Sequence, residues 1–349
     1  MSSEFNRQNN LDFLRFAAAT LVLFSHCYAI SGRSAEEPFA LLTRIEHGGG
    51  FAVSLFFVLS GYLITGSFLK SKSAFEYLGK RILRLFPALA VSTIICALVI
   101  GPIFTNMPLN DYFSNLAFAN YWSNLYLKIQ FNLPGVFLTN PYPNTINGSL
   151  WTLPIEFTMY LLVLIIGLLG GLRLKIVLLS IGFFWLFNFY LLGKFGEADA
   201  HFLHVMLVKE IFKLGGFFFS GGLLFLVRDI YRPSGLHAFL AVGVFAIALS
   251  TPYAEFVYAL TLPVIVMYLA FVRVPTISQF GKFGDFSYGI YIYAFPIQQV
   301  VTYMNNGNIS VNSLFLVSFI FTLMAAVISW FLFEKPALKL KGGLRRVLI

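Results

Sequence analysis

The stretch Leu11–Ile30 is apolar and long enough to span a bilayer, yet it carries Arg15 and His26. The eleven-residue step between them returns to within about 20° of the same helix face, roughly 16 Å further along the axis. Ionisable side chains inside a membrane usually face a polar pathway. Two such groups on one stripe therefore predict a wet, functional cavity rather than contact with lipid. A structural role is the alternative, with Arg15 reaching the surface beside Asp12.

Two arginines, Arg81 and Arg84, stand one helical turn apart in the segment KRILRLFP. This segment lies at the predicted cytoplasmic end of the third apolar run. Two guanidinium groups on one helix face bind a polyphosphate well. The alternative is an ordinary positive anchor at the cytoplasmic membrane surface.

Glu156, in GSLWTLPIEFTMYLL, enters the fourth apolar run from the predicted outer side. A buried carboxylate needs a partner, and His26 is the predicted one. Otherwise Glu156 caps its helix at the water interface. The two cysteines, Cys27 and Cys96, lie in different apolar runs and predict neither a disulfide framework nor a metal site.

Hydrophobic residues make up 58% of the 349-residue chain, charged residues make up 11%, and the mean hydropathy is +0.79. Such a composition predicts an all-α, polytopic membrane protein whose partners include membrane lipids. The net charge is +9, but the Lys and Arg residues cluster between apolar runs. This placement indicates membrane topology and not a nucleic-acid partner.

We predict a single integral-membrane domain, residues 1–349, with about ten transmembrane helices and both termini in the cytoplasm, because the positive connections alternate along the chain. The predicted spans are about 11–30, 50–69, 86–104, 150–169, 174–192, 211–227, 236–250, 253–272, 284–303 and 311–333.

The connection at about 105–149 is the only long one, and we predict that it is extracytoplasmic. It is rich in Asn, Pro and aromatic residues, including Tyr121 and Trp122, and Trp151 follows it. Aromatic faces with amide donors and acceptors suit a polyhydroxylated ligand, so these three residues are candidate contacts for a sugar. An interfacial belt of Trp and Tyr explains the composition equally well.

Six motifs, in order along the chain, together resemble the acyltransferase 3 family of integral-membrane acyltransferases. They are the Arg15-x10-His26 arrangement, FFVLSGYLIT at 56–65, the Arg-x-x-Arg of 81–84, SLWTLPIE at 149–156, FSYGIYIYAFP at 286–296 and FEKPALK at 333–339.

The resemblance implies a membrane O-acetyltransferase of the bacterial inner membrane that moves an acetyl group from cytoplasmic acetyl-CoA to an extracytoplasmic carbohydrate. The acceptor would be O-antigen, capsule, exopolysaccharide or a lipid-linked sugar. It implies His26, Glu156 and Arg15 as catalytic residues, Arg81, Arg84 and Arg15 as donor-binding residues, and no metal. The chain departs from many relatives at Ala294, where they have a histidine, so a second catalytic imidazole is not expected.

A protein of another class is the main alternative. In a secondary transporter or lipid-linked-sugar flippase, Arg15, His26 and Glu156 would form a proton relay. The sequence leaves open the acceptor sugar, the length of the acyl group and the oligomeric state, a homo-oligomer included.

Overall fold

The computed structural model describes residues 9–195 and 203–341. Every named element in this part of the chain is helical, and the one β pairing among the described residues is an isolated bridge between Thr105 and Val136. The all-α prediction is therefore confirmed for these residues.

Within residues 9–195 and 203–341, six helical segments are long and apolar enough to cross a membrane, so the chain is a multi-pass membrane protein. Each corresponds to one predicted span, whereas the other four predicted spans fall on helices outside this set. The total of about ten therefore stays a prediction, and the chain ends that we predict to be cytoplasmic lie outside the described residues. The six segments are Leu11–Ile30, Gly48–Lys70, Ala74–Phe104, Gly148–Gly170, Ala254–Phe271 and Val311–Lys339.

The chain forms two compact units, each described here by itself. The first comprises the described residues of 1–14, 53–77 and 155–280, and the second those of 15–52, 78–154 and 281–349. Four helices have residues in both units: α1 (Leu11–Ile30), α3 (Gly48–Lys70), α4 (Ala74–Ile95) and α8 (Thr152–Gly170).

The first unit also holds α9 (Leu174–Phe195), α10 (Leu203–Leu226), α11 (Gly235–Ala248) and α12 (Ala254–Phe271). Glycines let its helices approach closely. A Cβ on Gly61 of α3 would lie 1.7 Å from the carbonyl oxygen of Phe218, and one on Gly221 of α10 would lie 2.0 Å from that of Val58. Close approach of this kind, at small residues, is typical of packed membrane helices.

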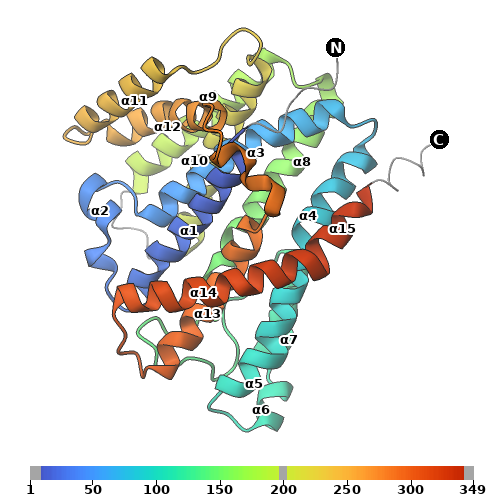
Figure 1. Cartoon of the computed structure of the whole chain (residues 1–349), viewed down its shortest axis with the longest axis vertical. Coiled ribbons are helices and arrows are strands. Elements are labelled where there is room, and N and C mark those ends of the chain that lie inside the picture. Colours follow the sequence, from blue (N-terminus) through green and yellow to red (C-terminus); the bar gives the residue numbers. More distant parts are fainter. Residues whose placement is uncertain (1–8, 196–202, 342–349) are drawn as a thin grey trace. The chain divides into compact units, whose positions relative to one another are not determined.

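The second unit adds α2 (Pro38–Thr43), α5 (Gly101–Phe104), α6 (Leu109–Ser114), α7 (Leu116–Tyr121), α13 (Ser287–Met304), α14 (Val311–Ser329) and α15 (Lys335–Lys339). Two helical rods in it are longer than predicted. Helices α4 and α5 are joined by the π-helical turn Cys96–Ile100 into one 31-residue segment, and α14 and α15 are joined by a second π turn, Trp330–Glu334 (Figure 1). Because α4 begins at Ala74, Arg81 lies well inside a helix.

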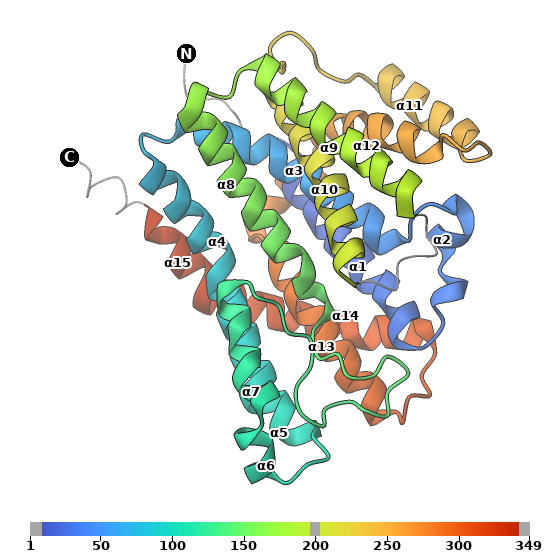
Figure 2. The ribbon, with the colours of Figure 1, turned by 180° about the vertical axis from the view of Figure 1, so that it is seen from behind.

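The long connection between α7 and α8 is fastened to α13, beside which it runs in Figure 2. The amide of Gln299 donates to the carbonyls of Tyr142, at 2.8 Å, and Thr145, at 2.6 Å, and Asn140 donates to the Gln299 side chain at 2.8 Å. In addition, Asn147 donates to the carbonyl of Ile292 at 2.9 Å. These buried amide bonds hold an irregular loop in a defined position.

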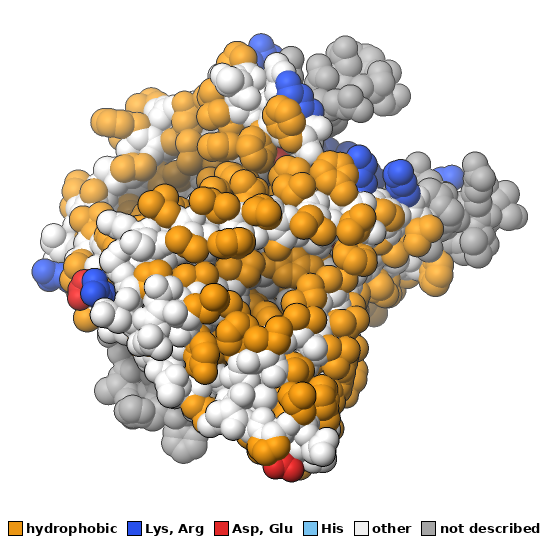
Figure 3. Space-filling view, turned by 60° about the horizontal axis from the view of Figure 1, so that its bottom comes forward, with side chains coloured by type: hydrophobic (Ala, Val, Ile, Leu, Met, Phe, Trp, Pro, Cys, Tyr) orange, Lys and Arg blue, Asp and Glu red, His pale blue; other side chains and the backbone are white. Residues whose placement is uncertain are grey.

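Hydrophobic side chains cover most of the face in Figure 3, and the few charged ones lie mostly near the edges of that view. Many large apolar side chains are exposed along the helices, as expected where lipid tails replace water as the solvent. Examples are Leu168, Leu169, Phe239, Ile247, Phe321 and Leu332.

Candidate active site

Helices α1 and α13 of the second unit lie side by side and carry the central site residues. Near its start, α1 contacts the turn before α13, because Arg15 pairs with Asp285, two residues before that helix begins. Eleven residues later, the His26 ring meets the Phe295 ring edge-on, with centroids 5.2 Å apart. Both side chains therefore face α13, as the helical spacing predicts, and the two helices run in the same direction.

Asp285 joins two arginines that the sequence placed in separate motifs. Its Oδ2 atom lies 2.7 Å from Arg15 Nη1 and 2.7 Å from Arg84 Nη2, and all three side chains are at most 22% exposed. Two guanidinium groups at hydrogen-bond distance favour the ionised form of this carboxyl. Asp285 is therefore ionised and anchors both arginines.

The turn before α13 positions this carboxylate. Gly284 has a φ of +129°, a conformation that favours glycine. Asp285 then accepts a hydrogen bond from the Ser287 hydroxyl at 2.5 Å and another from the Ser287 backbone N–H, at the positive end of the helix dipole. The sequence GDFS thus holds an anion between the two arginines.

A second carboxylate extends the cluster. Glu334, in the π turn that follows α14, lies 3.8 Å from Arg84 Nη1 and accepts a hydrogen bond from the Ser329 hydroxyl at 3.0 Å. Tyr293 of α13 donates to that same hydroxyl at 3.0 Å. A chain of buried polar groups therefore lies beside the second guanidinium edge of Arg84.

Cations outnumber anions around this cluster. Burial, followed by the nearby charges of Arg81, Arg84 and Lys80, lowers the pKa of Lys341 to about 8. A lysine loses its proton more readily among like charges, so the site has a surplus of positive potential. A polyanionic ligand would relieve that repulsion, which fits the predicted phosphate grip of Arg81 and Arg84.

His26 lies among apolar and ring atoms on the α13 side of α1. Among the described residues, no group forms a hydrogen bond to its buried Nδ1 atom. The adjacent Cys27 is buried and accepts a hydrogen bond from Gln298 at 2.9 Å. Cys27 is therefore a packing residue, whereas His26 has a ring nitrogen that can bond to a ligand.

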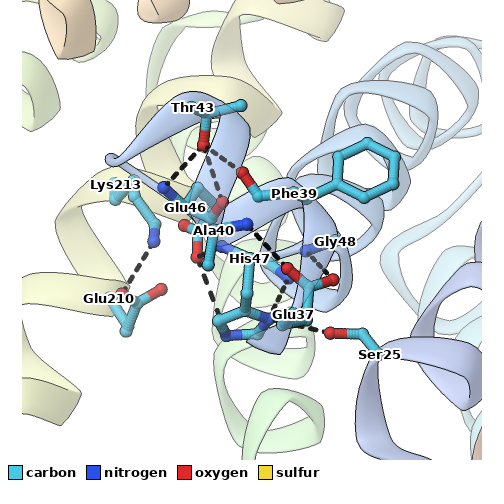
Figure 4. Close-up of polar contacts among 11 residues, drawn as sticks. Ser25, Glu37, Phe39, Ala40, Thr43, Glu46, His47, Gly48, Glu210 and Lys213 are labelled. Atoms are coloured by element: carbon cyan, nitrogen blue, oxygen red, sulfur yellow. Dashed lines mark hydrogen bonds and ion pairs between the residues drawn. The ribbon is translucent and has the colours of Figure 1, made fainter. Parts of the chain in front are cut away.

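A second imidazole, His47, lies near His26. The sequence had predicted no second catalytic imidazole, because Ala294 stands where many relatives have a histidine. The His47 Nδ1 atom lies 3.3 Å from the hydroxyl of Ser25, the residue before His26 (Figure 4). The two histidines are close enough for a charge on one ring to act on the other.

Glu156 belongs to the first unit. Its Oε1 atom accepts hydrogen bonds from Tyr160, one turn along α8, and from Ser60 of the FFVLSG motif at 3.5 Å. Because His26 belongs to the other unit, the pairing of Glu156 with His26 stays a prediction.

The three aromatic candidates for sugar contact lie in different surroundings. Tyr121 is fully buried in a core cluster with Cys96, Tyr112 and Phe137, and Trp122 packs against that cluster. A buried ring has no face to offer a sugar, so we do not retain Tyr121 as an acceptor contact. Trp151 is partly buried at the end of the 3-10 turn Gly148–Trp151.

Comparison with known proteins adds the decisive observation. The family model described as an acyltransferase domain matches residues 8–334. The chain belongs to the acyltransferase 3 family. It is 31% identical over 338 residues to the O-acetyl transferase of Shigella phage Sf6, with 95% of this chain and 96% of that protein covered. It is 26% identical over 365 residues to nodulation protein 10 of Rhizobium leguminosarum bv. viciae, with 97% and 95% covered. No solved structure matches the chain.

As a member of the acyltransferase 3 family, the chain is an enzyme, an O-acetyltransferase. Sequence reasoning named Arg15, Arg84 and His26 of this candidate site, and their roles stay predictions; it did not name Asp285, Lys341 or His47. Asp285 directly precedes the FSYGIYIYAFP motif, and His47 precedes the run Gly48-Gly49-Gly50. The signal for Asp285 was a lone acid at the start of a predicted span. The signal for His47 was the run of three glycines that follows it.

Proposed function

We propose that this chain transfers an acetyl group from cytoplasmic acetyl-CoA to a hydroxyl of an extracytoplasmic carbohydrate, across a bacterial inner membrane. The observation that carries the proposal is that one face of α1 carries a cationic cluster at one end and an imidazole at the other. Arg15, in the cationic cluster, and His26, the partly buried imidazole, are separated by roughly 16 Å of α1.

The cationic end suits the phosphates of the donor. Arg81, Arg84 and Lys341 supply the cations, and Asp285 keeps the guanidinium groups of Arg15 and Arg84 oriented. Planar guanidinium groups bind phosphate bidentately, and fixing them in advance reduces the entropy lost on binding. Arg15 lies too far along the helix from His26 to act on the same bond, so we assign it to the donor.

At the other end, His26 would act as general base. The acceptor hydroxyl loses its proton to the imidazole as its oxygen bonds to the acetyl carbon, the carbon–sulfur bond of the thioester breaks, and the proton passes to the CoA sulfur. Neutral imidazole is required at the start, and burial among apolar groups favours it. An acetyl-histidine intermediate is the alternative route through the same residue.

The acceptor would enter beside the long connection 105–149. Its Tyr142 ring packs edge-on against Phe295, with centroids 5.8 Å apart, and Phe295 in turn contacts His26. Tyr142 is 40% exposed, so this ring offers the surface that Tyr121 lacks. A glycan or lipid-linked sugar stacked there would have its hydroxyls near the imidazole.

The transporter alternative predicts no reaction with acetyl-CoA, whereas membership of the acyltransferase family favours the enzyme. Replacement of His26 tests the proposal directly. His26→Ala should lower transfer about 10²–10⁴-fold, because this is the usual contribution of a general base. The measurement is CoA release by purified protein in detergent, with membranes of cells that lack this chain as acceptor.

His237→Ala is a matched control, since His237 is exposed on α11 and its Nδ1 atom lies 2.8 Å from the Ser234 hydroxyl. Full turnover by folded His26→Ala protein would remove His26 from the mechanism. Absence of CoA release by the unmodified protein, under all acceptor conditions, would contradict the proposed function itself.

A further inference from the structure

We propose that a cavity between α4, α13 and α14 holds the hydrocarbon chain of a lipid-linked sugar, the acceptor of the proposed reaction. This inference rests on the proposed function and narrows its acceptor to one chemical class. The cavity has a volume of about 230 Å³, and the residues that line it belong to the second unit. Both π turns contribute to its wall, Cys96–Ile100 after α4 and Trp330–Glu334 after α14.

The wall of this cavity is almost entirely apolar. Its hydroxyl groups already have partners within the protein. Tyr293 donates to Ser329 at 3.0 Å, and Ser329 donates to Glu334 at 3.0 Å. Ser92 accepts a hydrogen bond from Asn147 at 3.4 Å. Because apolar cavities of this kind stay dry and take apolar guests, the wall favours a hydrocarbon over water or a sugar.

The cavity opens towards the lipid side of its helices. Ile95, Ile328 and Phe333 line it, and each of these side chains is also exposed at the surface. All three lie in segments that are long and apolar enough to cross a membrane, where exposed side chains contact lipid tails. A lipid chain can therefore enter the cavity from the bilayer without passing through water.

The predicted topology places this cavity in the outer half of the bilayer. If α1 starts at the cytoplasmic surface, Arg15 is roughly 6 Å deep, and Arg84 lies at the same level because both pair with Asp285. Along the α4 rod, the lining residues Val91 and Ile100 follow Arg84 by roughly 10 and 24 Å. In an apolar core of about 30 Å, the cavity then reaches from the middle to the outer surface. The chain that fits it belongs to a lipid of the outer leaflet.

The cavity also adjoins the place that we propose for the sugar. Pro296 of α13 lines the cavity, and the preceding residue, Phe295, contacts His26. Asn147, which bonds to the cavity wall, belongs to the long connection, and a Cβ on the next residue, Gly148, would lie 2.6 Å from Phe295. A sugar at the outer end of a chain in the cavity would therefore lie beside the connection and the imidazole. This continuity favours a lipid-linked sugar over a phospholipid.

Filling the cavity tests the proposal. The protein is placed in phosphatidylcholine nanodiscs, and the acceptor probe is the lipid extract of cells that lack this chain, either intact or after hydrolysis has detached its glycans from lipid. Ala325→Phe should raise the half-saturating amount of intact extract about 10-fold, because the new ring takes the space of several methylene groups. The half-saturating amount of hydrolysed extract, the maximal rate and the Kd for acetyl-CoA should stay within about 2-fold.

Val91→Phe fills the cavity from α4 and carries the test if thermal unfolding shows that Ala325→Phe fails to fold. Val317→Phe is the matched control, because Val317 is exposed on α14 outside the cavity. Unchanged saturation by intact extract in folded, filled variants would overturn the proposal and leave the cavity to a phospholipid chain. Equal losses for both forms of the extract would also overturn it, since the effect would not depend on the chain. Absence of transfer by the unmodified protein to either form would instead refute the proposed function.

Discussion

Asp285 couples the two arginine motifs of the charged cluster to each other. One carboxylate oxygen serves two guanidinium groups from helices far apart in the sequence, so the positions of Arg15 and Arg84 depend on each other. Groups that share a partner in this way have coupled energies.

This coupling leads to a prediction for a double-mutant cycle. Asp285→Ala and Arg84→Ala should each lower stability in detergent, but the double variant should lose less than the sum. We expect a coupling energy of about 1–3 kcal/mol, because either single change removes part of the compensation of a buried charge. Thermal unfolding of the four proteins measures it. Asp111→Ala, an exposed acid on α6, should combine additively with Arg84→Ala, and additive losses for Asp285 would contradict the shared anchor.

Lys341 predicts how donor binding depends on pH. Its pKa is lowered to about 8, so it is charged below that pH and neutral above it. The affinity for CoA should therefore fall by up to about 10-fold as the pH rises from 7 to 9, because one charged contact to phosphate is lost. Calorimetry across this range provides the measurement. Lys341→Gln should bind more weakly at pH 7 and show a flatter profile, and an unchanged slope would exclude Lys341 from the donor site.

Among the elements, α3 and α10 depend most on small residues. Because the Cβ of an alanine at Gly61 would lie 1.7 Å from the carbonyl oxygen of Phe218, the two backbones would have to separate. Gly61→Ala should destabilise the protein by at least about 2 kcal/mol, as overpacking of a close contact does. Gly243→Ala on α11 is the matched control, because its Cβ would meet no atom within 4 Å. Equal unfolding temperatures for both variants would refute the close approach.

Sequence patterns predicted these elements unevenly. Continuous apolar runs identified the six membrane-spanning segments because hydrophobic length alone defines them. Helix α13 is not among the six, and its buried amides Gln298 and Gln299 bond to α1 and to the long connection. The start of α4 at Ala74 was missed by twelve residues, since its first turns carry the charges that hydropathy treats as a connection.

Helical spacing predicted only the part of the candidate site that lies on a single helix. Arg15 and His26 share a face because both lie on one uninterrupted helix. No spacing rule could bring Asp285 to Arg15 or His47 to Ser25, because those contacts join segments 270 and 22 residues apart. They depend on how helices and turns pack, which a single sequence does not encode in a local pattern.

For the whole molecule, α1 and α13 run in the same direction, and this agrees with the predicted topology, in which both start from the cytoplasm. If α1 starts there at about Leu11, Arg15 is roughly 6 Å and His26 roughly 22 Å deep in an apolar core of about 30 Å. The donor end then faces the cytoplasm and the acceptor end faces the outside, so that only the acetyl group has to cross.

Vectorial transfer follows as a prediction. In sealed vesicles of known orientation, labelled acetyl-CoA on the cytoplasmic face should give ester on glycan exposed to the opposite compartment. Permeabilised vesicles serve as the control for glycan that is present but inaccessible. Product confined to the compartment that received acetyl-CoA would contradict transfer across the membrane, while leaving the enzyme class intact.

The shared carboxylate of Asp285 also constrains how this protein can evolve. A chain that lost Asp285 alone would keep two neighbouring cations without their anion, and one that lost Arg15 or Arg84 alone would keep an anion with half its support. Single substitutions at these sites therefore pass through a disfavoured intermediate. Among relatives, we expect the three positions to vary together, with a charge change at one accompanied by a compensating change at another.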